Sequence, residues 1–212
     1  MNKPLVSCLM LTHNKLEPFK LSLDCYNKQT YENKELIIVN SGSDEYFTSV
    51  SKILPKRKDI KHIKVKNGDL FVGDLRNISI DNASGDYLCT FDDDDIHAPN
   101  RIEFQMSYIF KYKNIHGTLL KNFNVNFLNT VYCCSFYQGL HPSLLVKRNH
   151  LKYPSLNRHE DTEYIDMLHN EFNILVIDNI SNIYTYCYHN DNISGKAHFE
   201  YIINNHKRFI GG

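Results

Sequence analysis

Apolar residues in the first half of the chain fall in short runs, separated by segments in which apolar residues recur at helical spacing. The runs predict buried strands at residues 5–12, 35–39, 60–65 and 87–91. The segments between them predict helices that follow Asn14, that span about 45–54 and about 73–83, and that begin at Pro99. Strands and helices that alternate in this way predict an α/β fold with a doubly wound, mostly parallel sheet.

The start of the first helix carries a specific signal. Asn14 is a residue type that caps helices, and Glu17 follows it at the spacing of a capping box. Phe19, Leu23 and Tyr26 would share one face of this helix. We therefore expect Asn14 to cap the helix.

The pattern changes after about residue 115. Short runs typical of strands occur at residues 117–120, 131–136, 143–146, 174–177 and 183–188. Helical spacing predicts two helices, at about 160–171 and at about 197–210. No repeat or linker divides the chain, so we expect residues 1–212 to form one domain.

Composition restricts the classes of function. Lys and Arg number 24, as do Asp and Glu, so a net charge of zero gives no argument for a nucleic-acid partner. None of the six cysteines forms a Cys-x-x-Cys pair, so we expect no zinc knuckle and a reduced, cytoplasmic protein. No segment approaches the ~18 apolar residues of a membrane-spanning helix, so we expect no membrane span.

Four consecutive carboxylates, residues 92–95, follow the predicted strand at 87–91. If the strand continues through them, Asp92 and Asp94 point to one side and Asp93 and Asp95 to the other. A pair of carboxylates with room for water and phosphate oxygens suits Mg²⁺ or Mn²⁺. An acidic, solvated turn is the alternative interpretation.

Polar residues also follow two other predicted strands. Thr12, His13 and Asn14 end the first strand, and Asn40 and Ser41 end the second. Ligands of doubly wound sheets bind beyond the carboxyl ends of the strands. We therefore expect these clusters to converge with the aspartates on one crevice.

Ordered blocks along nearly the whole chain resemble the family 2 glycosyltransferases of the GT-A fold. The blocks are residues 6–14, residues 29–31 with 35–43, residues 74–77, residues 83–87, residues 91–96 with Pro99, and Glu160 with Asp161. The resemblance implies a metal-dependent, inverting transfer of a sugar from a nucleotide-diphosphate sugar to an acceptor hydroxyl. It also implies a Rossmann-like nucleotide-sugar-binding half at residues 1–115 and an acceptor-binding half at residues 116–212. A UDP-sugar and a glycan would be the partners.

The resemblance implies roles for individual residues. Asp94 and Asp92 would bind Mn²⁺ or Mg²⁺, and His189 occupies a late block from which a histidine can reach the metal or the diphosphate. The side chains at the nucleotide sugar would be Thr12, Asn14, Asn40, Arg76, Asp92 and Asp93. Asn40 and Ser41 stand where the family commonly has acidic residues. The Asn40 amide can bond a base through either end or can serve only the turn.

Asp161 would be the general base that takes the proton of the acceptor hydroxyl. Glu160 and Glu163 are competing candidates, and acidic residues also favour the first turn of a helix for electrostatic reasons. His141 lies where the acceptor-side loop of the family is expected, and the sequence gives it no role.

Other functions use similar parts. A nucleotidyltransferase would be expected to have a glycine-rich phosphate loop after the first strand, and no glycine occurs at residues 12–18. A carbohydrate-binding relative without transfer activity is a second alternative, against which the presence of Asp92, Asp94 and Asp161 argues. A glycoside hydrolase would need two carboxyl groups at a set separation, which the sequence does not give.

Overall fold

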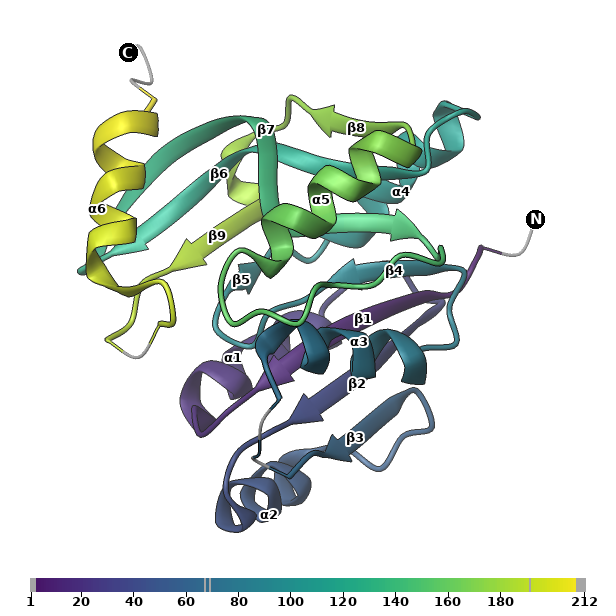
Figure 1. Ribbon diagram of the computed structural model, residues 1–212, viewed down its shortest axis with the longest axis vertical. Coiled ribbons are helices and arrows are strands. Elements are labelled where there is room, and N and C mark those ends of the chain that lie inside the picture. Colours follow the sequence, from purple (N-terminus) through teal and green to yellow (C-terminus); the bar gives the residue numbers. More distant parts are fainter. Residues whose placement is uncertain (1–2, 67, 69, 191, 209–212) are drawn as a thin grey trace.

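The computed structural model describes residues 3–66, 68, 70–190 and 192–208. Along the chain the elements are β1 (Val6–Thr12), α1 (Leu16–Asn27), β2 (Lys34–Asn40), α2 (Asp44–Ile53), β3 (Ile60–Lys64), α3 (Val72–Asn82), β4 (Tyr87–Thr90), β5 (Ile96–His97), α4 (Arg101–Lys111), β6 (Gly117–Phe127), β7 (Thr130–Lys147), α5 (Glu160–Glu171), β8 (Ile174–Ile177), η1 (Ser181–Ile183), β9 (Tyr184–Cys187) and α6 (Gly195–His206). The strands form a single sheet in the order β3-β2-β1-β4-β7-β6-β9-β5, with β8 paired to β6 (Figure 1).

The first four strands confirm the prediction of parallel pairing. β1 pairs in parallel with both β2 and β4, and β2 pairs in parallel with β3. Their carboxyl ends therefore point the same way and bring the residues after Thr12, Asn40 and Thr90 to one edge of the sheet. β7 then joins β4 in antiparallel pairing and carries the sheet into the second half of the chain (Figure 1).

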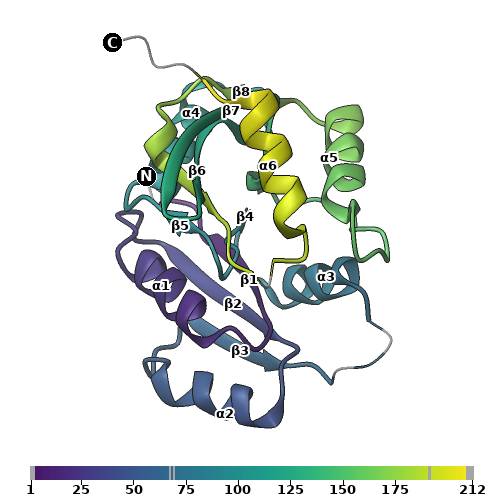
Figure 2. The same cartoon turned by 90° about the vertical axis from the view of Figure 1, so that its left-hand side faces the viewer.

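Helices cover both faces of the parallel part (Figure 2). Val6, Cys8 and Met10 of β1 belong to an apolar cluster that includes residues of α1, α2 and α4. Leu9, on the opposite face of β1, belongs to a cluster with Ile80 of α3 and residues of α5. Continuous apolar runs in these strands are therefore explained by burial on both faces.

The antiparallel second half departs from the predicted boundaries. β6 extends to Phe127, and β7 joins the predicted strands at 131–136 and 143–146 into one. Gly139 and Pro142, which lie between the two predicted strands, are typical of a break, but these residues remain in β7 because it pairs with β6 across register shifts. The predicted strand at 183–188 begins later, because residues 181–183 form a 3₁₀ turn before β9.

The helix ends also differ. Lys15, and not Asn14, precedes the first residue of α1, and no side chain caps this helix. The capping prediction is wrong because Asn14 has a left-handed backbone (φ 53°) and its side-chain oxygen accepts from the Ser43 N–H instead, at 3.0 Å. α6 ends at His206, and Ile210, where the sequence placed its end, lies outside the described residues. Within the described part of the chain, no helix is long and apolar enough to cross a bilayer.

Candidate functional site

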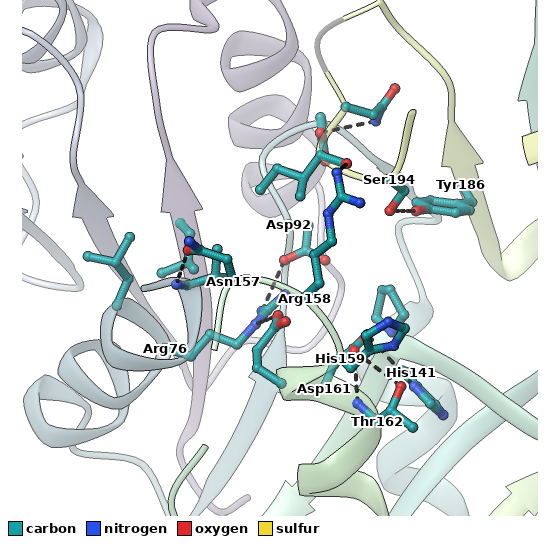
Figure 3. A pocket seen from close by; sticks show the side chains of 18 of the residues that line it. Arg76, Asp92, His141, Asn157, Arg158, His159, Asp161, Thr162, Tyr186 and Ser194 are labelled. Atoms are coloured by element: carbon teal, nitrogen blue, oxygen red, sulfur yellow. Dashed lines mark hydrogen bonds and ion pairs between the residues drawn. The ribbon is translucent and has the colours of Figure 1, made fainter. Parts of the chain in front are cut away.

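A pocket of about 1010 Å³ opens at the carboxyl ends of β1, β2 and β4. One wall comes from the first half of the chain and includes Thr12, Arg76 and residues 92–94. The opposite wall comes from the second half and includes residues 136–142 of β7, the start of α5, and one face of α6 (Figure 3). The convergence expected from the sheet topology is therefore present, and the second half closes the pocket.

The aspartate run lies in a turn and does not continue β4, which ends at Thr90. Phe91 anchors the turn: it is fully buried and its ring centroid lies 3.8 Å from that of His97. The Ser22 hydroxyl donates to the Asp92 carbonyl oxygen at 2.8 Å. These contacts fix the backbone at the point where the carboxylates begin.

The four aspartates do not divide into two alternating pairs. Asp92, Asp93 and Asp94 all line the pocket, so the alternation predicted from strand geometry is wrong for Asp93. Asp95 is buried, and it accepts from the Tyr184 hydroxyl at 2.5 Å and from the Cys187 N–H at 2.9 Å. Asp95 therefore ties the turn to β9.

Asp94 receives positive and hydrogen-bonding partners from two other segments. Its Oδ2 lies 2.8 Å from His189 Nε2 and 3.2 Å from Lys15 Nζ. Burial by itself raises the pKa of Asp94, but the hydrogen bond with His189 and the Lys15 charge outweigh burial and lower it. Asp94 is thus an ionised carboxylate at neutral pH. His189 reaches it from the segment after β9, although it does not itself line the pocket.

Asp94 and His189 can hold a metal ion only if a bound ligand supplies further oxygen atoms. Among the described residues, no group of three His, Cys, Asp or Glu side chains is arranged to hold an ion. Mg²⁺ is usually bound through one or two carboxylates together with substrate phosphates and water. Asp94 with His189 therefore fits an ion that is shared with a diphosphate, and does not fit an ion that the protein holds alone.

Arg76 of α3 connects the two walls. Its Nη1 lies 3.4 Å from Asp92 Oδ1, and its Nε donates to Glu160 Oε1 at 3.1 Å. Figure 3 shows its guanidinium pointing toward Asp92. Arg76 is therefore a largely buried bridge between Asp92 and Glu160. Because the Asp92 carboxylate already pairs with Arg76, a role of Asp92 as a metal ligand stays a prediction.

Asp161 is the second residue of α5 and lines the part of the pocket that comes from the second half of the chain. His159, which precedes the helix, has a left-handed backbone (φ 65°) that turns the chain into α5. Burial opposes ionisation of Asp161, but the neighbouring His141 and the Arg76 charge outweigh it and lower its pKa to about 2. The carboxylate is therefore ionised, and carries no proton, at any pH near neutrality.

The competing acids lie in different surroundings. Glu160 is buried, and Arg76 occupies its carboxylate. Glu163 is exposed and is not among the residues that line the pocket. Glu160 also lines the pocket, but of the three acids at the start of α5 Asp161 is the one that lines the pocket without an ion pair to an arginine among the described residues.

The predicted nucleotide-sugar residues divide into two groups. Thr12, Arg76, Asp92 and Asp93 line the pocket. Asn14 and Asn40 lie outside the lining: Asn14 bonds Ser43, as described above, and Asn40 is fully buried.

Both ends of the Asn40 amide are used within the protein. Its Oδ1 accepts from the Gly42 N–H at 2.9 Å, and its Nδ2 lies 3.1 Å from His62 Nε2. Burial lowers the pKa of His62 to about 4, so this imidazole is neutral at pH 7 and accepts from Asn40. The sequence allowed two roles for Asn40, contact with a base and support of the turn. The structure indicates support of the turn.

His13, which the sequence placed in a polar cluster at the crevice, lines the pocket and contacts the Ser41 carbonyl oxygen through Nδ1 at 3.0 Å. Other lining residues were not identified from the sequence. Lys15 at Asp94 could have been suspected, since it directly follows the polar cluster at the end of the first strand. Arg158, His159 and His198 carry no local signal, because only the packing of α5 and α6 over the sheet brings them to the pocket.

The family described as Glycosyl transferase family 2 matches residues 7–132. An uncharacterized glycosyltransferase of Methanocaldococcus jannaschii is 30% identical over 175 residues, which cover 72% of this chain and 59% of the relative. One of Haemophilus influenzae is 35% identical over 123 residues, which cover 58% of this chain and 37% of the relative. One of Rickettsia felis is 32% identical over 111 residues, which cover 52% of this chain and 18% of the relative. The chain therefore spans well under two thirds of the length of each.

Solved structures agree on the fold. S. aureus TarS 1–349 in complex with UDP-GlcNAc matches with a TM-score of 0.76 at 16% identity, over 92% of this chain and 60% of that one. The mannosyltransferase PcManGT from Pyrobaculum calidifontis, in complex with GDP-Man and Mn²⁺, matches with a TM-score of 0.64 at 12% identity, over 88% and 57%. The family match covers more than half of the chain, so this protein belongs to glycosyl transferase family 2 and has the GT-A fold.

Proposed function

We propose that the chain catalyses a metal-dependent, inverting transfer of a sugar from a nucleotide-diphosphate sugar to a carbohydrate hydroxyl. One observation carries this proposal: Asp94 and Asp161 line the same pocket but come from different segments, the turn after β4 and the start of α5. A displacement at the anomeric carbon needs a leaving group on one side and a base on the other. The two carboxylates are arranged for these two tasks.

The donor half of the pocket would hold the nucleotide. Thr12, His13 and Ser41 lie where the first two strands end and are accessible from the pocket, whereas Asn40 is not. We therefore assign base and ribose contacts to these three residues. Structures of the TarS neighbour are in complex with UDP and with UDP-GlcNAc, which makes UDP-sugars the first donors to test.

Asp94, with His189 beside it, would hold Mn²⁺ or Mg²⁺ together with the two phosphates of the donor. A divalent ion in this position supplies Lewis-acid neutralisation of the charge on the departing diphosphate. Lys15, 3.2 Å from Asp94, would move aside or contact a phosphate oxygen when the donor binds. The neighbour PcManGT is described with Mn²⁺, which supports a divalent ion in this fold.

Asp161 would act on the acceptor. Its carboxylate takes the hydroxyl proton while the acceptor oxygen bonds to the anomeric carbon and the bond from that carbon to the diphosphate breaks. One displacement inverts the anomeric configuration. Arg76 keeps Glu160 out of this reaction by occupying its carboxylate.

A panel of nucleotide sugars tests the proposal. The purified chain is incubated with each donor and with mono- and oligosaccharide acceptors, with Mn²⁺ or with EDTA, and nucleotide release and product are measured. We expect one donor to give Mn²⁺-dependent release of nucleoside diphosphate with a product of inverted configuration. Tight donor binding without any product would favour the carbohydrate-binding alternative. Formation of a nucleoside triphosphate and a sugar phosphate when pyrophosphate is added to the nucleotide sugar would favour the nucleotidyltransferase.

A further inference from the structure

His141 lies beside the proposed base on the acceptor wall of the pocket. Its Nδ1 is 3.7 Å from Asp161 Oδ2, and both residues line the pocket (Figure 3). The other carboxylate oxygen of Asp161, Oδ1, accepts from the backbone N–H of Thr162 at 2.8 Å. The two oxygens are therefore held from different sides, one by the helix start and one by the imidazole.

The strand that carries His141 is bent toward the pocket by extra residues. Leu120 of β6 faces Leu140, but Asn122 faces Ser135, so residues 136–139 of β7 lie opposite Lys121 alone. Gly139 closes this bulge with a left-handed backbone (φ 84°), and a Cβ there would lie 2.6 Å from Leu119 Cβ. Only glycine satisfies both conditions. The bulge aims the residues that follow it, which is a common use of such insertions near active sites.

Buried polar groups fix the backbone on the other side of His141. The Ser143 hydroxyl accepts from the Leu120 N–H at 2.8 Å. Arg101 is fully buried, and its Nη2 donates to the Pro142 carbonyl oxygen at 3.4 Å. Burying a guanidinium is costly unless it is hydrogen-bonded, so this contact indicates a position that the fold holds firmly.

Stability does not explain the His141–Asp161 pair well. The two side chains are 23% and 35% exposed, and partly exposed ion pairs contribute only about 0–1 kcal/mol. A separation of 3.7 Å is also long for a hydrogen bond. Catalytic hydrogen bonds are often long before the substrate binds and tighten in the complex. Nδ1 must carry the proton in this arrangement, because a nitrogen lone pair would repel the carboxylate.

We propose that His141 is a positioning residue that orients the Asp161 carboxylate toward the acceptor hydroxyl. The inference rests on the proposed function, because Asp161 is its base. With Oδ1 bonded to Thr162 and Oδ2 steadied by the imidazole, the carboxylate plane is fixed and one lone pair of Oδ2 remains directed into the pocket.

Three variants test the inference in the full chain. His141→Ala removes the donor, and His141→Asn keeps an N–H donor near the place of Nδ1. His150→Ala is the matched control, since His150 also pairs with a carboxylate, Glu171 at 3.3 Å, but is 73% exposed and outside the pocket. For each variant, kcat and donor KM are measured with the nucleotide sugar that the donor panel identifies.

We expect His141→Ala to lower kcat by roughly 10–100-fold, the usual effect of losing an outer partner of a reacting group, with donor KM unchanged. His141→Asn should recover most of the loss, and His150→Ala should match the wild type. If His141→Ala stays within about twofold of the wild type while Asp161→Asn is inactive, the proposed function stands and the inference fails. A higher donor KM with an unchanged kcat would also overturn the positioning role of His141.

Crystal structures of the wild type and of His141→Ala give a readout that needs no activity. The Asp161 carboxylate should hold one orientation in the wild type and turn away or spread over several in the variant. If no donor is turned over, the proposed function fails, and this comparison still decides the positioning role. An unchanged Asp161 orientation in the variant would refute that role.

Discussion

A hydrogen bond with a histidine and a nearby positive charge lower the pKa of both Asp94 and Asp161, but the surroundings of the two carboxylates differ. Asp94 lies beside Lys15 and beside His189, which would share a bound metal ion with it. Asp161 instead faces His141 and the Arg76 charge, with open pocket in front of it. The aspartate run could be identified from the sequence because it directly follows an apolar run that predicts a buried strand, whereas Glu160 and Asp161 were identified through the resemblance to the family. Asn40 could not be placed from the sequence, because burial of its amide depends on His62, which lies on β3.

Asp94→Asn should abolish metal-linked donor binding and leave the fold intact, because the amide keeps the shape but loses the charge that an ion requires. Calorimetric titration of nucleoside diphosphate with and without Mn²⁺ measures this. In the wild type, Mn²⁺ should tighten nucleotide binding, and the nucleotide should tighten Mn²⁺ binding by the same factor. An Asp94→Asn variant that keeps Mn²⁺-dependent affinity would place the metal elsewhere.

Burial of the His62 imidazole should make the free energy of unfolding depend on pH. It accepts from Asn40 through Nε2, donates to Ser51 through Nδ1 at 3.2 Å, and has its pKa lowered by burial to about 4. The unfolded imidazole takes up a proton at about pH 6.5, so between this pH and about 4 the unfolded state binds more protons. The free energy of unfolding should therefore fall as the pH drops through this window.

Urea denaturation at several pH values checks the His62 prediction. His62→Gln keeps an acceptor for Asn40 and removes the titration, so the decline between about pH 6.5 and 4 should be shallower in this variant. Equal slopes in the wild type and in His62→Gln would show that other groups cause the decline.

The elements of the first half could be predicted because parallel strands buried on both faces are continuous apolar runs. β7 could not be predicted as one strand, because its middle, residues 136–142, contains Gly139 and Pro142, which are typical of breaks between strands. The bulge depends on pairing with β6, which a local pattern does not contain. The middle of β7, which could not be predicted as part of a strand, is thus the segment that carries His141.

Helix α3 depends on a close approach at Gly73. A Cβ there would lie 1.8 Å from the Pro154 carbonyl oxygen, so Gly73→Ala must push α3 away from the segment that precedes α5. We expect a loss of about 1–3 kcal/mol in the free energy of unfolding, as for overpacked sites, and weaker donor turnover because Arg76 moves with α3. Urea denaturation measures the loss. Leu21→Ala, at a 62% exposed position of α1, is the control and should change little. A Gly73→Ala protein as stable as the wild type would contradict this packing.

At the scale of the whole molecule, the site exists only where the two halves meet. The aspartate turn and Arg76 come from the part before residue 115, and His141 and Asp161 come from the part after it. A single sheet passes through both parts and fixes one wall relative to the other. The fold class could be predicted from the order of strands and helices. The acceptor side of the pocket could not be predicted, because α5 and α6 reach the pocket only through long-range packing.

Turnover and donor binding of Asp161→Asn, measured beside Glu160→Gln and Glu163→Gln, test the base assignment most directly. We expect Asp161→Asn to lose roughly 10²–10⁴-fold in kcat, the usual contribution of a general base, while its donor Kd stays near that of the wild type. Near-normal turnover of Asp161→Asn with an inactive Glu160→Gln or Glu163→Gln would move the base to another acid. Near-normal turnover of all three variants would contradict the inverting mechanism itself.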